Sequence, residues 1–193
     1  MRAIFLFSCV VLVACAPDLR KDHPFDGQTT TGPLVTSEPV EGGGKKLFID
    51  ATNKMSQVYV DLDEGREMKP EEAFSTSGWD LAFKRFDVFA NSGASSPDGV
   101  VEVAVIKDGD YASLTQAPAT GFAVDTPNRL FNEPEGGWYV YDLSVHRLVV
   151  RADLMYLVKT SAGAYLKLRM LDYYDAAGTP ASITLEYAPI AAP

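Results

Sequence analysis

The chain contains little cysteine and little histidine. Its 193 residues include two cysteines, Cys9 and Cys15, and two histidines, His23 and His146. Because both cysteines lie in the first fifteen residues, the rest of the chain offers no disulfide, no thiolate nucleophile and no cysteine ligand for zinc or an iron–sulfur cluster. Only His146 lies in the predicted folded part, which argues against any mechanism that needs a histidine as general base. We therefore predict that the protein is not an enzyme.

The sequence also lacks a run of basic residues and a glycine-rich phosphate loop. The net charge is -9, from 17 basic and 26 acidic residues, which argues against nucleic acid as a partner. Asp108-Gly109-Asp110 has no downstream glutamate at the spacing of a calcium loop. Asp61, Asp63 and Glu64 are clustered, but a period of two places Asp61 and Asp63 on the exposed face of a strand. The sequence therefore predicts solvated acidic residues and no metal site.

The only long apolar run lies at the N-terminus. Ala3–Ala14 follows Met1-Arg2 and is too short to span a bilayer as a helix, so residues 1–14 are predicted to be a signal peptide. The run ends in Leu12-Val13-Ala14-Cys15, which is typical of a bacterial lipobox with an acylated cysteine. The alternative is an ordinary secretory signal followed by a chance cysteine. Ala16 after Cys15, by resemblance to known bacterial sorting rules, favours the outer membrane.

The residues after Cys15 are rich in proline, glycine and threonine. They include Gln28–Gly32 and Gly42-Gly43-Gly44, and they show neither helical nor strand periodicity. Such a composition buries too little apolar area to offset the entropy of ordering it. We therefore predict that residues 15–45 form an acylated cysteine and a flexible tether, and that residues 46–193 form one domain.

The C-terminal part of this domain has the alternation of β-strands. Leu154–Thr160 and Tyr165–Tyr174 are separated by a short loop with Gly163, and a third strand around Ile183–Tyr187 follows a turn at Asp175–Pro180. In these strands, apolar and polar side chains alternate with a period of two, so one face is predicted to be buried. A meander of this kind needs a second layer to cover its apolar face.

The preceding segments supply that layer. Gln57–Asp63 is predicted to be a strand, Lys69–Ser75 a short helical turn, and Val100–Ile106 a central strand covered on both faces. The remaining predicted strands are Gly78–Val88, with buried Trp79 and a phase change typical of a bulge or a sharp bend, then Trp138–Leu143 and Leu148–Val150. The sequence thus predicts a mainly β fold: a single antiparallel β-sheet domain, sandwich-like, with a C-terminal meander and at most one or two short helices.

Several segments resemble the HmuY family in order and spacing. They are Tyr59–Gly65 (YVDLDEG), Gly78–Asn91 (GWDLAFKRFDVFAN), Gly137–Asp142 (GWYVYD), Tyr156–Gly163 (YLVKTSAG), Tyr165–Leu168 (YLKL), Leu171–Tyr174 (LDYY) and Thr184–Tyr187 (TLEY). The resemblance implies an all-β haem-binding lipoprotein of the bacterial outer membrane. Such a protein captures haem at the cell surface and passes it to an outer-membrane receptor.

The sequence departs from the best-known members of that family, which hold haem iron between two histidines. Lys84 stands where some relatives are expected to carry histidine. Iron ligands must be imidazole or thioether here, so the candidates are His146 with Met55 or Met68, whereas Met170 is predicted to be a core residue and Met155 lies inside a strand. The haem propionates would pair with Lys84, Arg85 or Arg147.

A second hypothesis belongs to a different class of function. In this alternative, a lipid-anchored β domain binds a protein or an envelope polymer on an HmuY-like scaffold that has no haem site. The numerous tyrosines fit either hypothesis, because tyrosine is suited to surfaces where one end of the ring is apolar and the other is wet.

Overall fold

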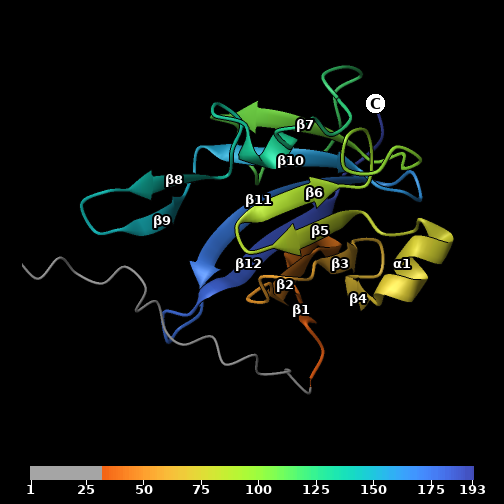
Figure 1. Ribbon diagram of the computed structural model, residues 1–193. Coiled ribbons are helices and arrows are strands. Elements are labelled where there is room, and N and C mark those ends of the chain that lie inside the picture. Colours follow the sequence, from red (N-terminus) through yellow and green to blue (C-terminus); the bar gives the residue numbers. More distant parts are fainter. Residues whose placement is uncertain (1–31) are drawn as a thin grey trace, which may run out of the picture.

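The computed structural model describes residues 32–193, so the predicted signal peptide, Cys15 and the first part of the tether lie outside the described residues. The chain folds into two antiparallel sheets that pack face to face, with a projecting two-stranded hairpin (Figure 1). Strand accounts for 43% of the structure and helix for 8%, which confirms the predicted mainly β class. Within residues 32–193, no helix is long and apolar enough to cross a membrane.

The larger sheet has six strands in the order β1-β2-β12-β11-β10-β7. They span Val35–Pro39 (β1), Lys45–Asp50 (β2), Pro180–Pro189 (β12), Tyr165–Tyr174 (β11), Leu154–Lys159 (β10) and Glu102–Lys107 (β7). The predicted meander is present as β10-β11-β12, and Leu168 lies opposite Tyr156 and Tyr187 in register. Side chains of one face, among them Leu47, Leu168 and Leu185, are fully buried in the main core.

The smaller sheet has four strands in the order β4-β3-β5-β6. They span Val58–Asp61 (β3), Arg66–Met68 (β4), Leu81–Lys84 (β5) and Asp87–Ala90 (β6). Its inner face contributes Val60, Phe83 and Val88 to the main core. On its outer face, Tyr59, Met68 and Trp79 form a second cluster with Ala73 of helix α1, Pro70–Thr76, which confirms the predicted helical turn.

Three short elements complete the described chain. They are the 3-10 turns η1, Glu41–Gly43, and η2, Leu130–Asn132, and the hairpin of β8, Tyr139–Asp142, with β9, Arg147–Val150. The hairpin projects beyond the sandwich, on the side away from α1 (Figure 1).

Two sequence predictions require correction, and a third is resolved between its two alternatives. Residues 35–45 are not tether, because β1 pairs with β2 and buries Val35 against the core. Val100–Ile106 is not central, because β7 is an edge strand that pairs only with β10 among the named strands. The phase change in Gly78–Val88, predicted as a bulge or a sharp bend, is a sharp bend, the tight β5–β6 hairpin: Lys84 pairs with Asp87, and Arg85 has a φ of 58°.

Candidate functional site

The β8–β9 hairpin carries five of the eleven exposed large apolar side chains of residues 32–193, more than any other element. These five residues are between 45% and 75% exposed: Val140, Tyr141, Leu143, Val145 and Val149. A group of exposed apolar side chains on one projecting element marks an interaction site more often than scattered single residues do. We call this hairpin, together with the β5–β6 turn and Tyr173-Tyr174 beside it, the hairpin surface.

The base of the hairpin is fixed to the end of β11. The backbone N–H of Leu148 donates to the hydroxyl of Tyr174 at 3.0 Å, and the Arg147 guanidinium lies 4.1 Å from the centre of the Tyr174 ring. The buried Leu148 side chain joins the main core. The tip of the hairpin has no comparable support from the described part of the sandwich, and it presents His146 at a φ of 52°, with its ring 6.4 Å from that of Tyr141.

Five aromatic rings form a continuous row under the hairpin. Phe86, Tyr139, Trp138, Tyr173 and Tyr174 follow one another with centroid separations of 5.7, 5.2, 5.9 and 5.0 Å. Trp138 is buried, and its indole N–H donates to the carbonyl of Phe86 at 3.0 Å, which ties the β5–β6 turn to the hairpin. The row joins three separate parts of the chain; Trp138 and Tyr173 are its buried members, Tyr139 and Tyr174 are half-buried, and Phe86 is exposed at one end.

The predicted propionate partners lie around this row. Arg85 is held by its backbone N–H, which donates to the carbonyl of Ala51 at 3.1 Å, and by its guanidinium, which donates to the Thr52 carbonyl at 3.3 Å. Burial raises the pKa of Tyr173, and the nearby charge of Arg85 opposes that rise. In residues 32–193, neither Lys84, Arg85 nor Arg147 forms an ion pair with a carboxylate. No carboxylate of the described residues therefore neutralises their positive charges.

The methionines fall in different places. Met55 is 87% exposed in the loop after β2, in which the neighbouring Thr52 contacts Arg85, so it lies at the same end of β5 as the hairpin surface. Met68 is buried with Tyr59 and Trp79 beside α1, on the other side of the molecule from the hairpin (Figure 1). Met170 is buried in the main core, as predicted, and Met155 is buried in β10. The structure therefore brings His146, Met55 and the three cations toward one end and leaves Met68 apart.

Two hollows lie on the outer face of the six-stranded sheet, with volumes of about 930 and 560 Å³. The larger is lined by Met155, Lys167 and Arg169, and both cations already have partners, although the Nε of Arg169 has none in the described part of the chain. Lys167 donates to the carbonyls of Tyr111 and Leu114 at 2.6 and 2.9 Å, and Arg169 pairs with Glu186 at 3.2 Å. An anionic ligand in this hollow would have to break those contacts, so it suits haem less well than the hairpin surface.

A separate cluster of carboxylates was only partly visible in the sequence. Asp61 and Asp63 do not lie together on an exposed strand face, because β3 ends at Asp61 and Asp63 lies in the following turn. They meet Asp80, which is fully buried just before β5, and oxygens of the three carboxylates lie within 4.8 Å of one another. Sequence reasoning missed Asp80; the signal that could have found it is an aspartate between Trp79 and Leu81 in an otherwise apolar segment.

These observations define a class: a two-layer antiparallel β protein with an exposed aromatic and cationic hairpin. The family model described as HmuY protein matches residues 53–147. The resemblance to the HmuY family that the sequence indicated is therefore confirmed. No curated protein matches the chain.

Solved structures share the fold at low sequence identity. A Bacteroides vulgatus protein assigned as HmuY-like and haem-binding has 19% identity and a TM-score of 0.56, with 81% of this chain and 97% of that chain covered. A Bacteroides fragilis protein assigned as a lipoprotein has 20% identity and a TM-score of 0.55, with 83% and 96% covered. The apo HmuY analog of Tannerella forsythia has 19% identity and a TM-score of 0.55, with 79% and 95% covered.

Proposed function

We propose that the protein binds haem or a related porphyrin at the hairpin surface, as a lipid-anchored, haemophore-like protein of the outer membrane. The observation that supports this most is the five-ring aromatic row flanked by Lys84, Arg85 and Arg147. Haem is a flat apolar ring with two carboxylates, and aromatic rings beside unpaired cations complement both parts. The HmuY family match and the fold shared with the Bacteroides vulgatus protein assigned as haem-binding agree with this proposal.

His146 is the proposed imidazole ligand of the iron. It is the single histidine of residues 32–193, and it stands exposed at the tip of the hairpin. Met55 is the proposed thioether partner, because its loop meets the β5–β6 turn through Arg85 and its side chain is exposed. Met68 is buried behind the other face of the smaller sheet and serves as a control.

Titration of haem into the purified protein tests this proposal. We expect a saturable Soret change, which His146→Ala shifts or abolishes and Met55→Leu alters, whereas Met68→Leu leaves it as in the wild type. Arg147→Gln should weaken binding several-fold through the lost charge. Lys69→Gln should not, because Lys69 is the N-cap of α1, which lies on the side of the molecule away from the hairpin (Figure 1). If the wild type shows no saturable change, haem binding is wrong. The exposed apolar hairpin would then be assigned to the alternative, docking of a protein or envelope polymer.

Anchoring through Cys15 is a separate part of the proposal. An acylated cysteine would hold the domain at the outer membrane, since several acyl chains in one bilayer give stable attachment. Cys15→Ala should release the protein from the membrane fraction and prevent palmitate labelling. A Cys15→Ala variant that still pellets with outer membranes would contradict the lipoprotein assignment, without bearing on the haem site.

A further inference from the structure

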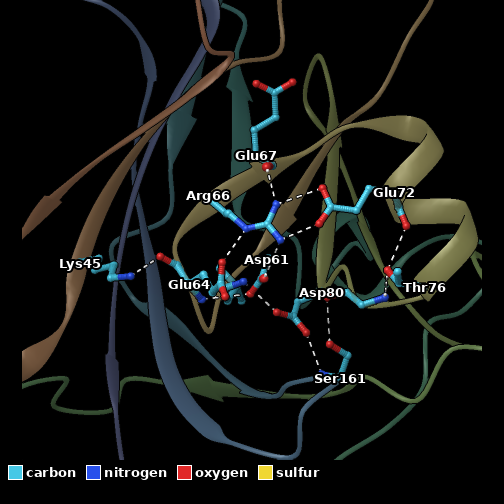
Figure 2. Close-up of polar contacts among 11 residues, drawn as sticks. Lys45, Asp61, Glu64, Arg66, Glu67, Glu72, Thr76, Asp80 and Ser161 are labelled. Atoms are coloured by element: carbon cyan, nitrogen blue, oxygen red, sulfur yellow. Dashed lines mark hydrogen bonds and ion pairs between the residues drawn. The ribbon is translucent and has the colours of Figure 1, made fainter.

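The carboxylate cluster lies where the turns of the two sheets meet. Asp61 ends β3, Asp63 lies in the β3–β4 turn and Asp80 precedes β5, while the β10–β11 turn of the larger sheet contributes Thr160 and Ser161. Figure 2 shows the Asp61 and Asp80 side chains close together between this turn and Arg66. One oxygen from each of the three aspartates lies within 4.8 Å of the others.

Asp80 is held in place by hydrogen bonds from both sheets. Its two carboxylate oxygens accept the backbone N–H groups of Leu62 at 2.8 Å and Ser161 at 2.7 Å. Burial raises the pKa of Asp80 to about 6. Burial also raises the pKa of Asp63, opposed by the hydrogen bond with Thr160 and supported by the charge of Asp61. The protein thus gathers negative charge at a site where it is partly shielded from water.

A buried hydroxyl faces this cluster and has no partner. Tyr187 of β12 is 3% exposed, and within residues 32–193 its hydroxyl makes no hydrogen bond. The hydroxyl packs against Gly65 in the β3–β4 turn. A β-carbon at position 65 would lie only 2.7 Å from the hydroxyl oxygen. Burial, and then the charges of Asp61, Asp63 and Asp80, raise the pKa of Tyr187. Buried polar groups are nearly always hydrogen-bonded, so this one points to a further group in the cluster.

Two cations border the cluster without neutralising it. The Arg66 guanidinium is 3.7 Å from Asp61, but its close contacts go to Glu64 at 2.6 Å and Glu72 at 2.7 Å. Hydrogen bonds to Glu72 and Glu64 raise the pKa of Arg66, so this charge is committed to those two residues. The Lys45 ammonium group donates a hydrogen bond to the backbone carbonyl of Glu64. Asp63 and Asp80 have no cationic partner in the described part of the chain.

We propose that Asp61, Asp63 and Asp80 bind one divalent cation, calcium, and that the Tyr187 hydroxyl faces the ion's coordination shell. Ca²⁺ takes oxygen ligands at roughly 2.3–2.6 Å, so three oxygens within 4.8 Å of one another can all contact a single ion. Asp63 is exposed, so water can supply the remaining ligands on that side. Mg²⁺ demands a tighter, near-octahedral shell that side chains fixed from two sheets are less able to form.

Calorimetric titration of the chelator-treated protein with CaCl₂ tests the site. We expect saturable binding of one ion, with a Kd of about 10⁻⁴–10⁻³ M or below, and a rise in Tm that follows occupancy. Asp63→Asn should weaken binding at least about tenfold, because it removes one of three anionic ligands. The matched control is Asp98→Asn, which makes the same charge change at an exposed loop position outside the cluster and should bind as the wild type does.

Several outcomes would overturn the proposal. One is no saturable binding; another is equal weakening by Asp63→Asn and Asp98→Asn, which would indicate general attraction to an acidic protein. Mg²⁺ binding as tight as Ca²⁺ binding would refute the calcium assignment. Tyr187→Phe removes only the hydroxyl and should lower Ca²⁺ affinity about threefold or more; unchanged affinity would show that Tyr187 does not face the ion. None of these outcomes depends on haem binding.

Discussion

The two ends of the sandwich differ in what they present to a ligand. At the hairpin end, apolar side chains and the unpaired cations Arg85 and Arg147 are accessible over an aromatic row. At the turn end, carboxylates are drawn together around buried Asp80. The same strands connect both ends: β5 has Asp80 just before it and Arg85 just after it, and β11 leads from the β10–β11 turn to Tyr174. A net charge of -9 therefore conceals two local environments of opposite character.

The distance between the ends makes them separable in experiments. The ten residues of β11 span roughly 30 Å. Substitutions so far apart, without shared partners, usually have additive effects on stability. A substitution at one end can therefore be judged with the other end as its reference.

The largest effect is expected from Trp138→Ala at the hairpin end. Trp138 is almost fully buried in the main core, and its indole ties the β5–β6 turn to the hairpin. Loss of this side chain should cost about 3–5 kcal/mol in the free energy of unfolding, measured from urea midpoints. Phe74→Ala, at a 70% exposed aromatic of α1, should change the midpoint little. Calcium affinity of the folded Trp138→Ala protein should equal that of the wild type; a parallel loss would show that the two ends are coupled.

An intermediate effect, on pH dependence, is expected from Asp80→Asn at the turn end. Because the pKa of Asp80 is raised to about 6 from 3.8, the native state holds a proton that the unfolded chain has already released. In chelator, the free energy of unfolding should thus fall as pH rises from about 4 to 6, by an amount on the order of 2 kcal/mol from this group. Asp80→Asn should remove that slope, whereas Asp98→Asn should keep it. An unchanged pH profile in Asp80→Asn would contradict the raised pKa.

The smallest effect on stability is expected at the hairpin tip. Leu143 is 75% exposed, so Leu143→Asn should shift the urea midpoint by no more than about 0.5 kcal/mol equivalent. Haem affinity should nevertheless fall, because the substitution removes apolar surface that the proposed ligand would cover. If the Leu143→Asn variant binds haem as tightly as the wild type, the haem site does not include the hairpin tip.

The sequence predicted those elements whose local pattern and tertiary role agree. The β10-β11-β12 meander followed from the alternation of Leu166, Leu168 and Met170 with Lys167 and Arg169, although Lys167 is itself buried beneath the Tyr111 and Leu114 carbonyls. The short helix followed from Pro70, which occupies its first turn. In such segments, an alternation of period two is enough to predict a strand, and a proline in the first turn is enough to predict the start of a helix.

The misses arose where tertiary structure overrides the local pattern. Arg85 is not a typical turn residue, so the phase change in Gly78–Val88 was visible but did not distinguish a bulge from the turn between β5 and β6. β1 looked like tether because its five residues have one buried side chain, Val35, and depend on pairing with β2. β7 looked central because it is rich in valine; in fact Val103, at its open edge, exchanges backbone hydrogen bonds with Ala123.

The candidate sites were predictable only in part. Lys84, Arg85, Arg147 and His146 could be named from their chemistry, but only the fold shows the aromatic row that connects their segments. The cluster of Asp61 and Asp63 with Asp80 joins residues from separate turns, and the approach of Tyr187 depends on the packing of two sheets. No spacing rule along the chain reports such a contact.

The two edge strands of the larger sheet affect whether neighbouring molecules of the protein would associate when they are crowded on a membrane. An unpaired strand edge invites a second molecule to extend the sheet, and attachment to a bilayer would raise that risk by concentrating copies in two dimensions. β7 has part of its edge occupied by Ala123. β1 is five residues long and ends in Glu38 and Pro39, one charged and one without an N–H to donate. Both edges thus discourage addition of a further strand, so neighbouring copies can remain separate monomers at high density.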